Sequence, residues 1–86
     1  MQRTAIFVGS FDPFTIGHDS IVRRSLPLFD RLIIGVGVNI GKRYMLSAEE
    51  RVDAIRRLYS DEPRISVEQY SGLTVDFADS VGAQFI

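Results

Sequence analysis

The stretch that decides the fold is residues 4–18, which read Thr-Ala-Ile-Phe-Val-Gly-Ser-Phe-Asp-Pro-Phe-Thr-Ile-Gly-His. Its first five residues form a short apolar run that is typical of a buried strand. A turn that starts with glycine follows, and a helical pattern begins after Thr15, so that His18 falls in the first turn of the helix. The stretch therefore predicts a strand, a turn and a helix N-terminus in direct succession.

This predicted helix N-terminus is a candidate anion site. The first backbone N–H groups of a helix have no intrahelical partner, and the helix dipole is positive there. His18, the chain's only histidine, and the Ser10 hydroxyl are placed near the same point, and Gly17 allows backbone to approach a ligand closely. A structural turn in which Thr15 merely caps the helix, for about 1 kcal/mol, is the simpler alternative. The spacing of the four residues favours a phosphate or nucleotide site.

Composition sets limits on the other functions. The chain has 86 residues, 45% of them hydrophobic, and a formal net charge of −1, which predicts one small folded domain and no attraction to nucleic acid. It has no cysteine, which excludes disulfides and thiolate metal sites, and one histidine makes a zinc site improbable. We find neither a signal peptide nor an apolar run long enough to span a membrane, and we expect a cytoplasmic protein.

Beyond residue 18 the hydrophobic pattern alternates between helix and strand. The expected elements are a helix over 18–29 that Pro27 ends near Leu26, a strand over 31–38, a helix over 48–59, a strand over 65–70 and a helix over 73–81. A fourth strand begins at residues 84–86. This order predicts an α/β fold with a parallel sheet and helices on both faces. We expect residues 1–86 to be the amino-terminal part of a single domain, truncated at the start of the fourth strand.

Helical periodicity also predicts which side chains face the core. Ser47 and Glu50 form a capping box that opens the helix over 48–59. On that helix we expect an inward face and an outward face, with Val52, Ile55 and Leu58 or Tyr59 inward and Arg51, Asp53, Arg56 and Arg57 outward. On the helix over 18–29 the expected inward residues are Ile21, Val22, Ser25, Leu26 and Phe29.

The motifs together resemble a known family. Gly9-Ser10-Phe11-Asp12-Pro13 followed by Thr15-Ile16-Gly17-His18 resembles the nucleotidyltransferase superfamily with its (His/Thr)-x-Gly-His signature. Within the superfamily the sequence is most similar to bacterial phosphopantetheine adenylyltransferases. The further agreeing stretches are Met1-Gln2-Arg3, Phe29-Asp30, Lys42, Ser47-x-Glu49-Glu50-Arg51, Gly72-Leu73-Thr74 and Phe77-Ala78.

The resemblance implies a Rossmann-like nucleotidyltransferase fold and a reaction. That reaction transfers an adenylyl group from ATP to 4′-phosphopantetheine and gives dephospho-coenzyme A and pyrophosphate. It further implies Mg²⁺ bound with ATP, coenzyme A as a possible feedback ligand, and a homo-oligomer, by analogy a hexamer. The 86 residues correspond to the amino-terminal half of such enzymes. The family's segments that place arginines on the phosphates and form the adenine pocket belong to the other half.

The resemblance also assigns roles to individual residues. His18 would contact the α-phosphate and stabilise the transition state, and the Ser10 hydroxyl and amide with the Phe11 amide would hold the nucleotide. Ser10 and Lys42 would bind the acceptor phosphate, and Thr74 would touch the pantetheine arm. Gly9 and Gly17 would support the turn. No residue is assigned as a metal ligand.

Some of these residues have simpler interpretations without the resemblance, and other functions remain open. Pattern alone makes Lys42 a solvated loop lysine, Thr74 a helix cap, and Asp12 and Pro13 residues that shape the turn. The alternative functions are another adenylyl- or cytidylyltransferase, such as a nicotinate-mononucleotide adenylyltransferase, and a non-catalytic nucleotide-binding fragment. Val8 and Ser10 depart mildly from a proline and a threonine that are common in the family.

Overall fold

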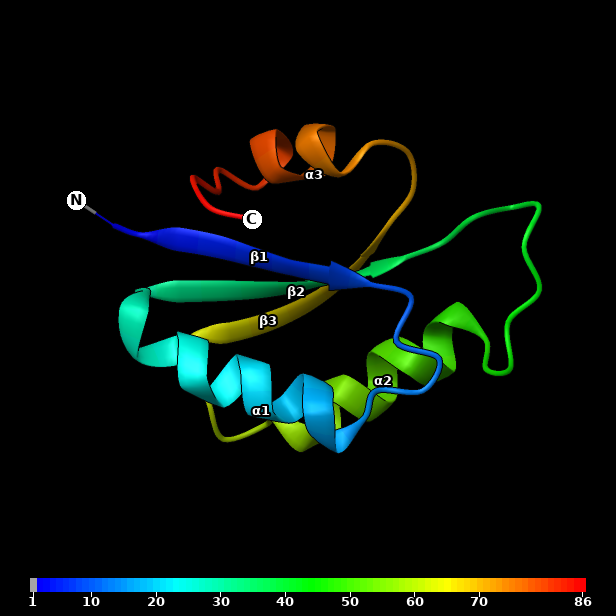
Figure 1. The fold of residues 1–86 in the computed structure, drawn as a ribbon, viewed down its shortest axis with the longest axis horizontal. Coiled ribbons are helices and arrows are strands. Elements are labelled where there is room, and N and C mark those ends of the chain that lie inside the picture. The colour runs from blue at the N-terminus through cyan, green and yellow to red at the C-terminus, as the bar shows by residue number, and fades with distance from the viewer. Residues whose placement is uncertain (1) are drawn as a thin grey trace.

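The centre of the molecule is a parallel sheet of three strands. The computed structural model describes residues 2–86, and Met1, which belongs to the resemblance, lies outside the described residues. The strands are β1 (Thr4–Gly9), β2 (Arg31–Gly37) and β3 (Ile65–Tyr70), in the order β1-β2-β3. Both pairs are parallel, as predicted, so all three strands end at the same edge of the sheet (Figure 1).

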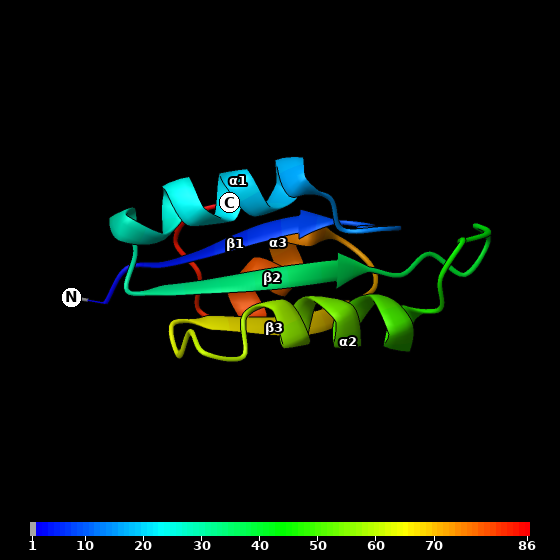
Figure 2. The same ribbon diagram turned by 90° about the horizontal axis from the view of Figure 1, so that it is seen from below.

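Helices cover both faces of the sheet. Helix α1 (Ile16–Ser25) continues into the 3₁₀ turn η1 (Leu26–Leu28), and α2 (Ala48–Leu58) lies on the same face, with α1 toward β1 and α2 toward β3 (Figure 2). Helix α3 (Thr74–Ser80) covers the opposite face (Figure 1). The expected α/β architecture is therefore confirmed. Within residues 2–86, no helix combines the length and apolar character that crossing a membrane requires.

The last residues of the chain return to the sheet beside β1. Phe85 forms an isolated parallel bridge with Ala5, and the Ile6 amide donates to the Phe85 carbonyl at 2.9 Å. The Gln84 side chain accepts from the Thr4 amide at 2.9 Å. Strand β1 thus has β2 on one side and residue 85 on the other, so the order of connection reverses at β1. In open α/β sheets ligands bind in the crevice outside the carboxyl ends of the strands at such a reversal.

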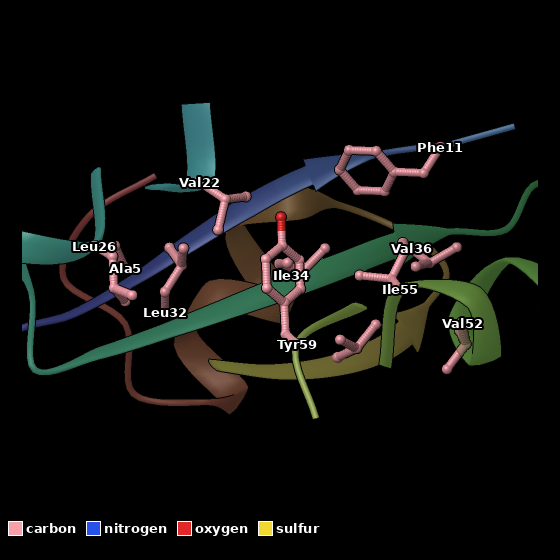
Figure 3. Packing of buried hydrophobic residues seen from close by; sticks show 11 residues of the cluster. Ala5, Phe11, Val22, Leu26, Leu32, Ile34, Val36, Val52, Ile55 and Tyr59 are labelled. Atoms are coloured by element: carbon pink, nitrogen blue, oxygen red, sulfur yellow. The ribbon is translucent and has the colours of Figure 1, made fainter. Parts of the chain in front are cut away.

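The core has two layers, one on each face of the sheet. The larger layer packs α1 and α2 on the sheet (Figure 3). Its buried members are Ala5, Phe11, Val22, Leu26, Leu32, Ile34, Val36, Val52, Ile55, Tyr59 and Val67. The smaller layer, under α3, holds Ile6, Ile33 and Ala78. Strand β2 contributes to both layers, which explains why its sequence is apolar at nearly every position.

Pro27 ends the first helix as predicted. The α-helical segment stops at Ser25, and Pro27 lies inside the following 3₁₀ turn. The expected capping box of Ser47 and Glu50 at the start of α2 is also confirmed. At the end of α3 the structure places Gly82, with φ of +73°. A positive φ favours glycine, which explains the choice of residue where this helix ends.

Two side chains, Ile21 and Arg51, do not lie where periodicity predicted, and the choice that the pattern left open between Leu58 and Tyr59 falls on Tyr59. Ile21 is 42% exposed and Leu58 is 48% exposed, whereas Tyr59 is buried and takes the inward place that the pattern left open between Leu58 and Tyr59. Arg51, predicted to face outward, is 1% exposed. Periodicity assigns faces by apolarity, so it could not detect an arginine whose partners are backbone carbonyls at the ends of other elements.

Candidate active site

The turn after β1 ends in a capped helix N-terminus. Thr15 is the N-cap of α1, and its hydroxyl oxygen accepts from the His18 amide at 3.3 Å. In return, Nδ1 of the His18 imidazole accepts from the Thr15 amide at 2.9 Å. Thr15 and His18 therefore form a reciprocal capping box in which histidine takes the place of the usual glutamate or glutamine.

This hydrogen bond determines where the proton of neutral His18 resides. Because a backbone N–H donates to Nδ1, that nitrogen carries no proton, and the neutral ring carries its proton on Nε2. Aromatic rings restrict the orientation of the imidazole: Phe11 lies edge-on to it at 5.0 Å between centroids, and Phe14 lies at 5.2 Å. The geometry leaves His18 with a single N–H donor, on Nε2, held in a fixed direction.

The carboxylate of Asp19, the residue after His18, forms hydrogen bonds with Tyr59 and Arg23. Asp19 accepts from the Tyr59 hydroxyl at 2.6 Å and from Arg23 Nε at 3.0 Å. The Tyr59 hydrogen bond, followed by that of Arg23, holds the pKa of Asp19 below its usual value. Burial, and then the hydrogen bond to Asp19, raises the pKa of Tyr59. The network joins α1 to the end of α2. The Arg23 guanidinium also compensates part of the negative charge of Asp19 near the N-terminus of α1.

The turn between β1 and α1 is held by Phe11 and Asp12. Phe11 has φ of +49° and its ring is buried in the core, so the backbone at this residue is in the left-handed region. A Cβ at Gly9 would lie 3.1 Å from the Phe11 ring, which explains the glycine. The Asp12 carboxylate accepts from the amides of Met45 and Leu46, and so it shapes the turn as expected.

A cleft of about 270 Å³ opens at the carboxyl ends of the three strands. Ser10 follows β1, Gly37 ends β2 and Tyr70 ends β3, and all three line the cleft together with Lys42 and Gly72. The structure therefore brings together two of the predicted site residues, Ser10 and Lys42, from segments 32 positions apart in the sequence. Their hydroxyl and ammonium groups can bind an anion.

The remaining predicted residues border this cleft or lie beside it. The Thr74 and Tyr70 hydroxyls are 3.1 Å apart, which connects Thr74 to the cleft wall. Leu73, not Thr74, is the N-cap of α3, so the simpler interpretation of Thr74 as a cap is wrong. His18 and Gly17 are on α1, outside the residues that line the cleft. A Cβ at Gly17 would meet only the Thr15 hydroxyl, at 3.6 Å, so the protein itself does not require glycine there.

Sequence reasoning missed three residues of this region. Tyr70 forms part of the cleft wall, Tyr44 lies between Lys42 and Arg51, and the Arg51 guanidinium contacts the ends of two strands. Tyr70 could have been predicted, since it is the last residue of a strand whose end faces the crevice. Arg51 stands in the Ser47-x-Glu49-Glu50-Arg51 stretch of the resemblance, which assigns it no role, and no pattern in the sequence identifies Tyr44.

A second depression, of about 440 Å³, lies between α2 and β3. Its lining includes Glu49, Glu50 and Asp53, which disfavour a phosphate, whereas the cleft beside Lys42 has no acidic residue in its lining. Within residues 2–86 no group of three or more histidine, cysteine or acidic side chains could hold a metal ion. The chemistry available is thus anion binding by a lysine, hydroxyls, a histidine N–H and a helix N-terminus.

Comparisons with known proteins agree with this arrangement. The chain is 56% identical to a phosphopantetheine adenylyltransferase of Bacteroides fragilis, over 99% of this chain and 57% of that protein. It is 54% identical to one of Flavobacterium psychrophilum, over 99% of this chain and 56% of that protein. The chain spans about half the length of the curated relatives it matches.

Two solved structures share the fold. One is a NadR protein in complex with NAD and AMP-PNP, with a TM-score of 0.75, 24% identity, and coverage of 85% of this chain and 21% of that chain. The other is a bifunctional NMN adenylyltransferase/ADP ribose pyrophosphatase of Francisella tularensis, with a TM-score of 0.70, 21% identity, and coverage of 95% and 27%. The sequence model of the cytidylyltransferase-like family matches residues 6–86. The chain belongs to the cytidylyltransferase-like family.

Proposed function

We propose that these residues are the amino-terminal part of a single-domain phosphopantetheine adenylyltransferase. Such an enzyme transfers the adenylyl group of ATP to the phosphate of 4′-phosphopantetheine. The observation that carries the proposal is the cleft in which Ser10 and Lys42 lie beside the capped helix that holds His18. The identity of more than 50% with enzymes of that name supports this acceptor over those of other family members.

The proposed chemistry needs no nucleophile from the protein. A phosphate oxygen of 4′-phosphopantetheine attacks the α-phosphorus of ATP, and the bond from that phosphorus to the oxygen bridging to the β-phosphate breaks. Pyrophosphate leaves with the electron pair, and dephospho-coenzyme A forms. Because the acceptor is already anionic at neutral pH, no general base is required, and the protein contributes positioning and neutralisation of charge.

Each site residue has a role that its position supports. His18 would donate its Nε2 proton to a non-bridging oxygen of the α-phosphate, and the first amides of α1 would face the same charge. Lys42 and Ser10 would hold the acceptor phosphate in the cleft, with Gly9 forming the close turn. The hydroxyl of Thr74 would contact the pantetheine arm beside Tyr70.

Magnesium enters this proposal as part of the substrate, MgATP. The carboxylate of Asp12, in the turn after β1, already accepts from two backbone amides, and residues 2–86 hold no group of three or more metal-ligating side chains. The chain's own described residues therefore do not fit a resident metal, whereas Mg²⁺ commonly binds through substrate phosphates. A homohexameric assembly and feedback by coenzyme A are further proposals that rest on the resemblance alone, and a cytoplasmic location is a proposal that rests on the pattern of the sequence.

Pyrophosphate release from MgATP tests the proposal. We would compare 4′-phosphopantetheine with nicotinate mononucleotide as acceptors, in this chain and in a version extended to the length of its relatives. The proposal expects release with phosphopantetheine alone, and a large loss in His18→Ala. Release with nicotinate mononucleotide instead would replace the proposed acceptor. Tight MgATP binding without release in either version would favour a non-catalytic nucleotide-binding protein.

A further inference from the structure

We propose that Arg51 is a positioning residue of this site. It holds the Lys42 loop, defined here as residues 38–47, in place against the turn after β1. The inference rests on the proposed function only in treating the cleft as an anion site. It concerns how Lys42 and Ser10 come to face the same anion, and not which acceptor the anion belongs to.

The first evidence is the set of partners of the Arg51 guanidinium. Its Nη1 donates to the Ser10 carbonyl at 2.7 Å and to the Gly37 carbonyl at 3.2 Å. Its Nε donates to the carbonyls of Leu46 and Ser47 at 3.2 and 3.3 Å. One side chain thus connects the segment after β1, the end of β2 and the last residues before α2.

The second evidence is the cost of placing a charge there. Arg51 is 1% exposed, and no carboxylate of residues 2–86 forms an ion pair with it. Burial of an unpaired charge is expensive, and an apolar side chain often serves stability as well or better. Filling the core therefore does not explain why residue 51 is an arginine. The guanidinium does explain it, because its several N–H groups can donate to several carbonyls at once.

Contacts lead from Arg51 to Lys42 through Tyr44. The Arg51 Cζ atom lies 4.0 Å from the centre of the Tyr44 ring. The Tyr44 hydroxyl accepts from the Asn39 amide at 2.9 Å, and the Asn39 carbonyl accepts from the Lys42 amide at 3.1 Å. The backbone at Lys42 is therefore fixed by a continuous series of contacts that starts at the buried guanidinium.

Asp12 holds the same loop from the other side. Its carboxylate accepts from the amides of Met45 and Leu46, the latter at 2.7 Å. The turn that contains Ser10 and Asp12 is therefore joined to the Lys42 loop twice, once through Arg51 and once through Asp12. With both connections made, the distance between Ser10 and Lys42 is set by the protein before any anion arrives.

Amide hydrogen exchange of Arg51→Lys and Arg51→Gln tests the positioning role without a ligand. Lysine keeps the charge but not the fork, so both variants should exchange faster at residues 39–46 while the strands stay protected. The matched control is Arg57→Gln on the same helix, since Arg57 is exposed and its ion pair is with the exposed Asp53. Loss of protection throughout the sheet in both Arg51 variants would overturn the proposal, because Arg51 would then support the fold as a whole.

Binding of inorganic pyrophosphate provides the second readout. We expect both Arg51 variants to bind it about tenfold or more weakly than the parent chain, as misplaced binding groups do. Lys42→Ala should weaken binding in the parent chain and add little in the Arg51→Gln background, because the two residues act on one contact. Parent-like affinity in Arg51→Lys, or additive losses in the double variant, would contradict a positioning role. The probe reports on anion binding alone, so a wrong acceptor assignment would leave this result unchanged.

Discussion

The hydrogen bond between Thr15 and His18 has consequences beyond the helix end. Because Nδ1 accepts this hydrogen bond, the neutral ring carries its proton on Nε2, which is then the N–H donor of the ring. The same bond anchors the ring, because Thr15 is the N-cap of α1. The contact that caps the helix thus also orients the Nε2 donor that we propose for the phosphate.

Nitrogen-15 NMR of the His18 ring can check this assignment. For the neutral form of the ring, long-range proton–nitrogen spectra should show a protonated Nε2 and an unprotonated Nδ1. Thr15→Pro, which removes the amide donor to Nδ1, should allow the two tautomers to mix. A protonated Nδ1 in the parent chain would contradict the structure.

Gly35 allows two aromatic rings to pack on the sheet. The Tyr70 and Phe77 rings stack at 4.5 Å, and a Cβ at Gly35 would lie 2.6 Å from Phe77 Cε2, with Val8 and Tyr70 atoms at 3.1 and 3.2 Å. Gly35→Ala should therefore lower the free energy of unfolding by about 1–3 kcal/mol in urea titrations.

Gly41→Ala is the matched control for that prediction. A Cβ at Gly41 would meet only the Asn39 side chain, at 3.9 Å, so the change should stay within about 0.5 kcal/mol. Equal effects of the two substitutions would show that the contacts around Gly35 are not as tight as described.

At the scale of elements, the capping box of α2 makes stability depend on pH. The Ser47 amide donates to the Glu50 carboxylate at 3.1 Å, and the hydrogen bonds from Ser47 hold the pKa of Glu50 below its ordinary value of 4.5. The folded state thus binds this proton less tightly than the unfolded state. Its contribution to stability is complete above 4.5 and is lost as the pH falls through the lowered pKa.

Urea unfolding from about pH 6 to about pH 3 tests this linkage. Glu50→Gln should make the free energy of unfolding fall less steeply on acidification than in the parent chain. Glu49→Gln, one residue earlier in the same turn and without the bonds to Ser47, is the control and should leave the slope near that of the parent. An unchanged slope in Glu50→Gln would rule out the linkage.

Element types could be predicted because their signals are local. The apolar run of β2, the proline in η1 and the serine–glutamate spacing before α2 each act within a few residues. Side-chain direction was less predictable: Tyr59 and Leu58 are neighbours where the helix ends, and only the tertiary contact with Asp19 decides which one turns inward. The sequence did not reveal the capping box of α1, because the residue at its N3 position is His18, whereas glutamate or glutamine is usual there.

The candidate site was predictable only in part, for a related reason. Ser10 and Lys42 stand in motifs, and their meeting in one cleft follows from parallel strands that end at one edge. Arg51 instead bonds with carbonyls that every residue possesses, so its partners leave no trace in the sequence. Tyr44 acts through contacts with Asn39 and Arg51, which helical and strand periodicity do not encode, whereas the position of Tyr70 at the end of β3 could have been predicted.

At the scale of the whole molecule, the connection order places the site. Strand β1 lies between β2 and Phe85, and the turn that leaves β1 leads directly into α1. The N-terminus of α1 and the Lys42 loop therefore flank the point where the connection order reverses. We propose that two anionic substrates meet there, one at His18 and one at Lys42.

NMR titration of the isotope-labelled chain with MgATP and with 4′-phosphopantetheine tests this claim most directly. We expect MgATP to shift the signals of Gly17 and His18 at the start of α1. We expect 4′-phosphopantetheine to shift those of Ser10, Lys42 and Gly72, and Lys42→Ala to weaken only the second response. Shifts confined to the acidic depression between α2 and β3, or no shift at these residues with either substrate, would contradict this claim.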